Sequence, residues 1–469
     1  MIEGLKPYPQ YNSHSSDWFG DIPNHWALKP NRAIFSEIKD RDHATEEMLS
    51  VTITRGIIRQ KALLEGSSKR DSSNQNKTAY KLVQPRDLAY NKMRAWQGAI
   101  GASAFRGIIS PAYVVMRFRS PDHIPNYFHH LYRIPQFAKE AERWSYGITS
   151  DMWSLRPEHF KLILTPLPPP DEQAAIVHFL DYANARIERA IRAKKKIVSL
   201  LNEQKQAIIH RAVTRGLDPN VKMKDSGIPW LGEIPEHWEV RRLKVVAEKI
   251  VDCLHATPKY STEGTYPAIR TADISPGVVH LKKAKRIPAA EYARWTERLA
   301  PRAGDILYSR EGERFGIAAC VPTGVKLCIS QRMMVFRVKD EFDSEFVMHL
   351  LNGRATYRQA LQDALGATVP HVNISTIRNY TLGLPNRAEQ SLIIEYIRSE
   401  TSSFSEILLR TEREISLLRE YRTRLTADVV TGKLDVREAA KNLPSEDPNP
   451  DIADDLDIEE TELETEEGQ

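Results

Sequence analysis

The chain has 469 residues, of which 41% are apolar and 27% are charged. A chain of this length exceeds the size at which one hydrophobic core stops growing, so we expect two or more domains. No stretch approaches the roughly 18 consecutive apolar residues of a membrane span, and the N-terminus has no basic region followed by an apolar one. We therefore expect no membrane segment and no secretory signal, and the composition predicts a globular, cytoplasmic protein.

A ten-residue phrase stands near the start of the chain and again in its middle. Residues 17–26 read DWFGDIPNHW, and residues 229–238 read PWLGEIPEHW, 212 positions later. A string this rich in Trp, Gly and Pro does not recur easily by chance, so we interpret it as the mark of a duplicated structural unit. We expect its tryptophans to belong to the domain cores rather than to stack on bases: Trp18, Trp26, Trp230 and Trp238.

Further segments recur in the same order, which supports the duplication. DLAYNKMRAWQGAIGAS (87–103) corresponds to GDILYSREGERFGIAAC (304–320), with Asp87 opposite Asp305 and Tyr90 opposite Tyr308. The remaining pairs are ISPAYVVMRF (109–118) with ISQRMMVFRV (329–338), LPPPDEQAAI (167–176) with LPNRAEQSLI (384–393), and VTRGLD (213–218) with VTGKLD (430–435). The segments 39–86 and 251–303 show no match, so a duplicated scaffold carries two different inserts.

The first part of each half predicts a mixed, strand-rich domain. Short β-branched runs interrupted by Gly, Pro and Asn, such as MLSVTITRGIIRQ and YPAIRTADISPGVVHL, are typical of strands. The apolar alternations 109–118 and 329–338 each predict one strand. Such a domain of about 130 to 160 residues has an ordinary size for a single domain.

Each half then changes to a helical period. From Asp171 to about Thr214, apolar residues recur at steps of three and four, and the spacing repeats 217 positions later. The predicted seam positions are Ile176, Leu180, Ala183, Ile187, Ala190, Ile197, Leu201 and Ile208 in the first helix, and Ile393, Ile397, Phe404, Ile407, Leu418, Tyr421 and Leu425 in the second. Some 44 residues make a helix roughly 65 Å long.

The ends of these helices carry their own signals. Asn386 with Glu389 predicts a capping box at the second start, and Gly216 and Gly432 stand where each helix should stop. Two long helices, each following a globular domain, pair most simply with each other in an antiparallel coiled coil that separates the domains around an approximate two-fold axis. The alternative is that each helix folds back on its own domain.

The net charge of +4 is unevenly distributed. Residues 445–469 hold 12 of the 62 acids and no Lys or Arg, so residues 1–444 carry 50 acids against 66 bases, a net charge of +16. A basic body suits a polyanion such as nucleic acid, and the acidic segment predicts a disordered tail. Cys253, Cys320 and Cys328 form no metal-binding spacing, and we expect them to be reduced.

The fold class that follows is α+β, with two strand-rich domains and two long helices in an internal pseudo-two-fold repeat. The predicted boundaries are 1–166 for the first domain, 167–218 for the first helix, 219–383 for the second domain, 384–444 for the second helix and 445–469 for the tail.

The paired phrases, the NKMRAWQGAIGAS and GDILYSREGERFGIAA segments and the LPPPDEQ and LPNRAEQ helix entries together resemble the specificity subunits of type I restriction-modification systems, over residues 17–440. The resemblance implies two target-recognition domains that each read half of a bipartite site in double-stranded DNA. It also implies that the helices dock two methyltransferase subunits, with restriction and motor subunits joining for cleavage. Because the inserts differ, the two half-sites should differ, which gives an asymmetric site.

Direct readout uses Arg or Lys for guanine and Asn or Gln for adenine, with basic and hydroxyl groups on phosphate. A surface Arg or Lys can equally be a plain solvated charge. The candidates in the first domain are Arg55, Arg59, Lys77, Lys81, Asn91, Lys92, Arg94, Gln97, Thr149 and Ser150. Those in the second domain are Lys259, Tyr260, Arg270, Arg310, Glu311, Arg314, Arg332, His371, Asn373 and Ser375.

No catalytic motif is found. There is no methyltransferase signature and no phosphate-binding GxxxxGK[ST] loop. The histidines, including His129-His130 and the pair His25 and His237, lack metal-site spacing and predict buried or capping roles. We expect no catalysis, cofactor or metal. The alternatives are a self-contained sequence-specific nuclease and a coiled-coil adaptor without DNA affinity; the run Lys194–Lys196 is either a solvated helix face or a phosphate contact.

Overall fold

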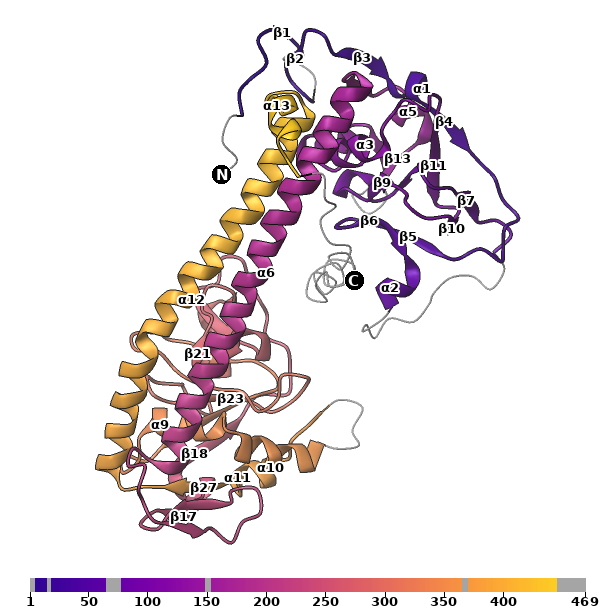
Figure 1. Cartoon of the computed structure of the whole chain (residues 1–469). Helices are drawn as coiled ribbons and strands as arrows, with labels where there is room; N and C mark the ends of the chain where they lie inside the picture. The colour runs from indigo at the N-terminus through magenta and orange to yellow at the C-terminus, as the bar shows by residue number, and fades with distance from the viewer. Residues whose placement is uncertain (1–4, 15–17, 65–76, 148–152, 365–369, 445–469) are drawn as a thin grey trace. The chain divides into compact units, whose positions relative to one another are not determined.

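The structure, a computed structural model, describes residues 5–14, 18–64, 77–147, 153–364 and 370–444 (Figure 1). The chain forms two compact units. Unit 1 contains residues 1–195 and 412–469, and unit 2 contains residues 196–411. Each unit therefore holds one strand-rich domain together with one half of each long helix. The predicted acidic tail lies outside the described residues.

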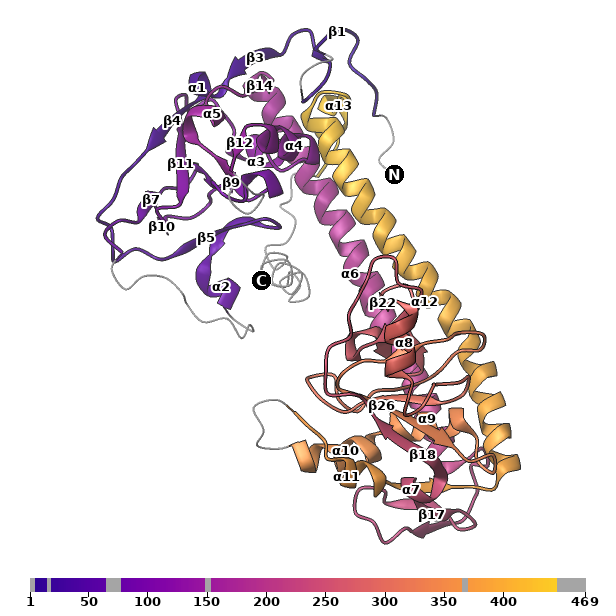
Figure 2. The same cartoon turned by 180° about the vertical axis from the view of Figure 1, so that it is seen from behind.

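Unit 1 is built on a four-stranded antiparallel sheet of order β4-β11-β8-β9, of which Figure 2 labels β4, β11 and β9. Its strands are β1 (Tyr11–Asn12), β2 (Ile22–Pro23), β3 (Ala27–Pro30), β4 (Phe35–Ile38), β5 (Leu49–Thr52), β6 (Gly56–Arg59), β7 (Lys81–Val83), β8 (Leu88–Asn91), β9 (Ile100–Ala102), β10 (Gly107–Ile109), β11 (Tyr113–Phe118), β12 (Ser145–Tyr146), β13 (Ser154–Leu155) and β14 (Leu164–Leu167). Its short helices are α1 (Asn31–Ile34), α2 (Gln60–Leu64), η1 (Ala95–Gln97), α3 (Pro125–Leu131), α4 (Pro135–Arg143), α5 (Pro157–Phe160) and α13 (Arg437–Lys441).

Unit 2 repeats this sheet in the order β18-β26-β23-β24. Its strands are β15 (Met223–Asp225), β16 (Glu233–Pro235), β17 (Glu239–Arg242), β18 (Ala247–Asp252), β19 (Tyr266–Ile269), β20 (Ile274–Ser275), β21 (Val278–Val279), β22 (Lys285–Ile287), β23 (Ile306–Ser309), β24 (Ala318–Cys320), β25 (Cys328–Ile329), β26 (Met333–Val338) and β27 (Thr381–Leu384). Its short helices are α7 (Leu243–Val246), η3 (Thr271–Asp273), α8 (Ala289–Trp295), α9 (Ser344–Leu351), α10 (Arg354–Ala364) and α11 (Ile374–Arg378).

The two units differ where the sequence shows no repeat. Unit 1 carries the hairpin β5–β6 and the pair β7–β10, whereas unit 2 carries the three-stranded sheet β22-β19-β25, in which β19 and β25 are parallel. The common sheet with unlike insertions is the arrangement that the paired anchors predict. One expectation is wrong: the alternations 109–118 and 329–338 do not form single strands, because each is interrupted. The interruptions coincide with Pro111, which has no backbone N–H, and with Arg332, whose φ of 69° is left-handed.

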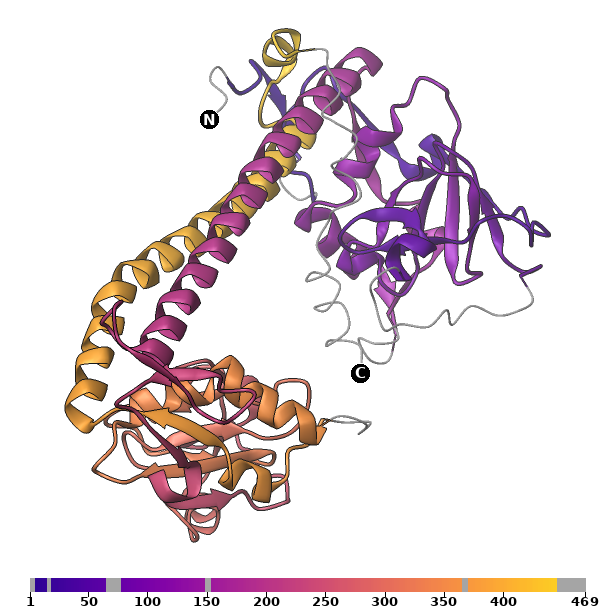
Figure 3. The same ribbon diagram turned by 60° about the horizontal axis from the view of Figure 1, so that its bottom comes forward.

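The long helices are α6 (Pro170–Arg215) and α12 (Arg387–Val430), which confirms both predicted helices (Figure 3). Gly216 directly follows α6, and Gly432 lies two residues after the end of α12; their φ values of 72° and 78° are left-handed, a conformation that glycine adopts without strain. Of the predicted capping box, only one half forms. The Asn386 side chain accepts the backbone N–H of Glu389 at 2.9 Å, but the Glu389 carboxylate is used elsewhere.

Within each unit the two helices run antiparallel. In unit 1, Lys194 donates to Glu414 at 2.6 Å and Arg422 donates to Glu188 at 2.8 Å, so residue numbers rise on one helix as they fall on the other. In unit 2, Lys205 lies 3.4 Å from Ser405. The contact between Lys194 and Glu414 shows that Lys194, the first residue of the lysine run 194–196, takes part in the pairing of the helices.

The seam of the helices departs from the prediction at two positions. Ile197 and Ile407 are each 46% exposed, whereas Val198 and Leu408 on the neighbouring positions are only half-exposed. The buried positions still follow each other at steps of four and three. Because an α-helix has 3.6 residues per turn and a heptad repeat needs 3.5, the buried face shifts around the helix, here by one residue.

The repeated His-Trp phrase fixes each domain to the start of a long helix. In unit 1, Trp26 Nε1 donates to Glu172 Oε1 at 2.9 Å and His25 Nε2 lies 2.8 Å from Glu172 Oε2. The hydroxyl of Tyr8 donates to the same carboxylate. Glu172 is buried, and a buried carboxylate is stable only when donors satisfy it. We call this cluster of Tyr8, His25, Trp26 and Glu172 the unit 1 lock.

The second copy of the phrase makes the same contacts in unit 2. Trp238 Nε1 donates to Glu389 Oε1 at 3.0 Å, and His237 Nε2 lies 2.8 Å from Glu389 Oε2. We call His237, Trp238 and Glu389 the unit 2 lock. Trp26 and Trp238 are buried, as the phrase predicts, whereas His25 and His237 are partly exposed and bind the helix carboxylate instead of lying in the core.

The glutamine that follows each lock carboxylate has a matching role. The Gln173 side chain accepts the backbone N–H of Ile124 at 2.9 Å and donates to the carbonyl of Pro168 at 2.8 Å. The corresponding residues in unit 2 are Gln390, Asp343 and Pro385. The hydrogen bonds of the Glu-Gln dipeptide at each helix start thus attach the helix to its domain.

The paired aspartates predicted from the repeat also have one function. The Asp87 carboxylate accepts two hydrogen bonds from Arg117, with Nε and Nη2 each 2.8 Å from a carboxylate oxygen. The Asp305 carboxylate accepts the same two bonds from Arg337 Nε and Nη2 at 3.0 and 2.7 Å. Both aspartates are buried, and both also cap a backbone N–H three residues earlier. These pairs join the two central strands of each sheet.

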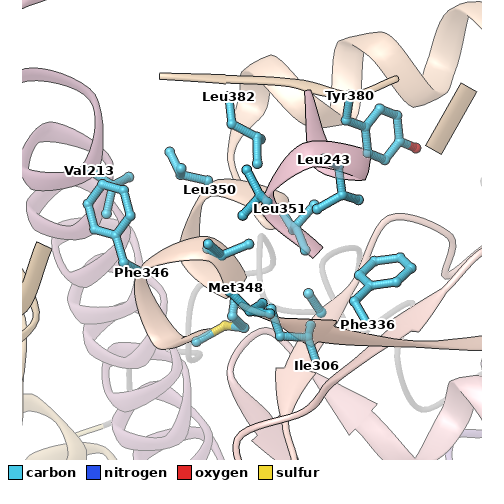
Figure 4. Close-up of a cluster of buried hydrophobic side chains, with 14 of the residues drawn as sticks. Val213, Leu243, Ile306, Phe336, Phe346, Met348, Leu350, Leu351, Tyr380 and Leu382 are labelled. Atoms are coloured by element: carbon cyan, nitrogen blue, oxygen red, sulfur yellow. The ribbon is translucent and has the colours of Figure 1, made fainter. Parts of the chain in front are cut away.

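The largest core cluster belongs to unit 2 and lies between the sheet, α9 and the last turns of α6 (Figure 4). Its members include Val213, Leu243, Ile306, Phe336, Phe346 and Tyr380. The three cysteines are free, and burial raises the pKa of both Cys320 and Cys328 to about 12, which keeps them as thiols. None of the helices in the described part of the chain has the length and apolar character that crossing a membrane requires.

Candidate nucleic-acid interface

In unit 1 the loop after β8 presents a basic surface at one end of the sheet. β8 ends at Asn91, which faces Tyr113 at the start of β11. The Asn91 side chain accepts the backbone N–H of Met93 at 3.0 Å, which turns the chain so that Arg94 is exposed. Lys92 is half-exposed in the same loop. These side chains can reach an external polyanion.

An aromatic pair supports this loop. Trp96 donates from Nε1 to the carbonyl of Met93 at 2.9 Å, and its ring meets Trp153 edge-on at a centroid distance of 5.4 Å. Gln97 ends the short helix η1 and is half-exposed. The loop is therefore held by rings while its polar side chains remain at the surface.

The hairpin β5–β6 places Arg55 in its turn and Arg59 at its end. Arg59 is exposed, lies 3.6 Å from Glu47 and stands over the Phe105 ring at 5.1 Å. Arg133 holds this turn, and the sequence analysis did not single it out as a candidate. Its guanidinium donates to the carbonyls of Thr52, Ile53, Thr54, Gly98 and Ile100. Arg133 thus joins the hairpin turn to the loop after η1.

The other candidates of unit 1 are placed differently. Lys77 is half-buried. Lys81 is buried, and its ammonium group donates to the carbonyl of Tyr113. Burial lowers the pKa of Lys81, with nearby Lys92 contributing. This position does not favour contact with DNA. Thr149 and Ser150 lie outside the described residues.

In unit 2 the corresponding end of the sheet carries an ionic network. Both Asp252, the last residue of β18, and Ser309, the last residue of β23, lie beside the start of β26. Arg310 follows β23 and is buried, with Nη1 3.2 Å from Asp252 and Nη2 2.5 Å from Glu311. His371 Nδ1 lies 3.2 Å from the same Glu311 oxygen. The structure thus brings together three predicted candidates, Arg310, Glu311 and His371.

Three further candidate arginines lie in unit 2. Arg332 is exposed, and its carbonyl accepts the backbone N–H of Arg310 at 3.0 Å. Arg314 donates to the carbonyl of Ile274 at 2.7 Å, which ties it to the domain. Arg270 forms a bidentate pair with Asp273 at 2.8 and 2.9 Å. Of the three, Arg332 is therefore the most available to a ligand.

The remaining candidates lie on neighbouring loops. Lys259 is exposed, and Tyr260 is half-buried with its hydroxyl 3.2 Å from Ser330 Oγ. The Lys285 ammonium lies 5.0 Å from the Tyr260 ring centroid. Asn373 and Ser375 are exposed at the start of α11. No motif in the sequence indicated Asp252, because its contact with Arg310 joins residues 58 positions apart.

Within the part of the chain that the structure describes, no group of three or more His, Cys, Asp or Glu side chains could hold a metal ion. His129 is half-buried beside Arg133, and desolvation lowers its pKa well below the ordinary value. A neutral histidine of this kind fits a packing role, since its ring lies against Gly56 and Gly101.

Comparison with known proteins agrees with this architecture. Residues 235–415 match the type I restriction modification DNA specificity domain. A specificity subunit of the type I restriction enzyme MjaVIII from Methanocaldococcus jannaschii is 23% identical over 353 residues, which are 73% of this chain and 78% of the relative.

A solved structure shares the fold. A chain from a study of complex assembly and conformational transition of a type I restriction-modification system has a TM-score of 0.61 at 15% identity, covering 87% of this chain and 98% of that one. The HsdS subunit from Thermoanaerobacter tengcongensis gives a TM-score of 0.41 at 16% identity, covering 88% and 98%.

The same four-stranded sheet occurs in both units, and the match to the specificity domain falls mainly on unit 2. The chain is similar to the specificity subunits of type I restriction-modification systems, and its residues 235–415 match their DNA specificity domain. Specificity subunits of type I restriction-modification systems are non-catalytic DNA-recognition subunits.

Proposed function

We propose that each unit reads one half of an asymmetric, bipartite site in double-stranded DNA, in the cytoplasm. The observation that carries this proposal is that one sheet and one lock occur twice while the insertions differ. A scaffold that repeats with its lock intact can present two different reading surfaces. Different surfaces select different base sequences, so a palindrome is not expected.

The residues of the two sheet ends supply the contacts. In unit 1 the exposed loop with Lys92 and Arg94 would bind phosphate or guanine, and the Arg133-held hairpin turn would present Arg55. In unit 2 the exposed side chains of Arg332 and Lys259 would likewise bind phosphate or guanine. The net charge of +16 on residues 1–444 supports attraction to the duplex.

The long helices would dock two methyltransferase subunits, with restriction and motor subunits joining the complex for cleavage. Both helices carry apolar side chains that are exposed in the free chain, which supports a protein partner. They are Ile197, Leu200, Leu392, Tyr396, Ile407, Leu409 and Leu417. Leu409 is 70% exposed, a large apolar surface on a helix whose other face is already paired.

Binding of the purified chain together with methyltransferase subunits tests both parts. We expect the complex to bind duplex DNA with an affinity that falls steeply with salt, and to select one bipartite sequence over others. Leu409→Asp should weaken copurification of the methyltransferase, whereas Ser403→Asp, which adds the same charge at an exposed polar position, should not. Copurification without any DNA affinity would instead support a coiled-coil adaptor.

A further inference from the structure

The ionic network after β23 assigns different parts to two adjacent residues. The Arg310 side chain is only 5% exposed and lies between two carboxylates, with Nη1 3.2 Å from Asp252 and Nη2 2.5 Å from Glu311. Two negative charges more than balance its single positive charge. Arg310 therefore offers neither surface nor net charge to a phosphate.

The backbone around Glu311 is held on both sides. The N–H of Arg310 donates to the carbonyl of Arg332, and the N–H of Val372 donates to the carbonyl of Arg310 at 3.1 Å. The N–H of Gly312 donates to the carbonyl of Pro370 at 2.9 Å. These three backbone hydrogen bonds fix the loop, so the backbone of Glu311 has a defined position from which its side chain extends.

The two oxygens of Glu311 have different surroundings. Oε1 accepts Arg310 Nε at 3.1 Å and Nη2 at 2.5 Å, and it lies 3.2 Å from His371 Nδ1. Oε2 has no hydrogen-bond partner among the described residues, and the side chain is 19% exposed. Burial alone would raise the pKa of Glu311, but the hydrogen bond and charge of Arg310, with His371, hold it below the ordinary value. The carboxylate thus stays ionised and can only accept hydrogen bonds.

We infer that Glu311 is a specificity-determining residue that accepts a hydrogen bond from the exocyclic amino group of a base in the major groove, and that Arg310 is the positioning residue that holds it. Such an amino group is N4 of cytosine or N6 of adenine. A carboxylate is repelled by phosphate, so at a DNA surface its favourable contact is with a base-edge donor. His371 fixes the same oxygen from the opposite loop, which leaves Oε2 for the base.

This inference rests on the proposed function, and the methylated sequence of the host genome tests the two separately. The complete complex is expressed with wild-type, Glu311→Gln, Glu311→Ala or Glu313→Gln chains. Glu313 is an exposed acid two residues further on and serves as the matched control. With the wild-type chain we expect a bipartite motif; its absence would overturn the proposed function itself.

With Glu311→Ala we expect discrimination at one position of one half-site to fall about tenfold or more, while the other half-site is unchanged. Glu311→Gln should change preference at that same position, because an amide can also donate. The base lost from the motif distinguishes cytosine from adenine. A wild-type motif from both Glu311 variants, with the bipartite motif intact, would overturn the inference.

The positioning role of Arg310 has its own readout. Arg310→Met should relax the same single position as Glu311→Ala, and Arg310→Lys should restore part of the discrimination, because an ammonium can still bind Oε1. A residue that acted only on stability would lower methylation at all sites without changing the motif. That outcome for Arg310→Met, with the protection of β26 (Met333–Val338) from hydrogen exchange unchanged, would refute the assignment.

Discussion

The two locks predict an unequal response to the same substitution. Glu172 is buried and accepts three donors, whereas the Glu389 side chain is 24% exposed and accepts two. Replacing Glu172 with Ala leaves the Trp26 indole and the Tyr8 hydroxyl without an acceptor in the interior. Each such group costs about 1–3 kcal/mol, so we expect unit 1 to lose about 3–5 kcal/mol of unfolding free energy. Glu389→Ala should cost unit 2 about 1–2 kcal/mol.

Hydrogen exchange measured by mass spectrometry resolves the units, which a single melting temperature cannot do in a chain of two units. Protection of β11 (Tyr113–Phe118) reports unit 1, and protection of β26 (Met333–Val338) reports unit 2. Glu158→Ala, at an exposed acid of unit 1, should change neither by more than about 0.5 kcal/mol. Equal losses for the two lock variants, or a loss for Glu172→Ala below that of Glu389→Ala, would refute the reasoning.

Three further predictions follow from single contacts. Asp305→Asn should cost unit 2 about 3 kcal/mol, measured by protection of β26, because it breaks a buried bidentate pair. Burial lowers the pKa of His349 to about 4, so the unfolded chain binds more protons than the folded chain between pH 6.5 and 4. The unfolding free energy of unit 2 should therefore fall by about 2 kcal/mol from pH 7 to pH 5. His349→Asn should flatten this pH profile. Arg94→Ala should reduce the salt slope of DNA binding by about one, measured by fluorescence anisotropy, whereas Lys81→Met should leave it unchanged.

The parts of the fold that could be predicted are those with a local signal. The helical period and the glycines that end each helix depend on neighbouring residues, and both were correctly predicted. The duplication was visible because the locks need the same residues in both copies. What the phrase binds was not predictable, since Trp26 and Glu172 are 146 positions apart.

The candidate recognition surface was less predictable for the same physical reason. Lys81 and Arg94 look alike in the sequence, yet one lies on a fully buried strand and the other on an exposed loop. Arg133 was missed because its five carbonyl acceptors come from two distant turns. Charge in the sequence therefore indicates candidate contacts with DNA, but not which side chains face outward.

The central claim is that one duplicated scaffold carries two unlike readers. Sequencing of methylated bases in the host genome, with and without this gene, tests it most directly. We expect a motif that disappears with the gene and has two different halves separated by unspecified bases. A perfectly palindromic motif, or a methylation pattern that does not depend on the gene, would contradict the claim.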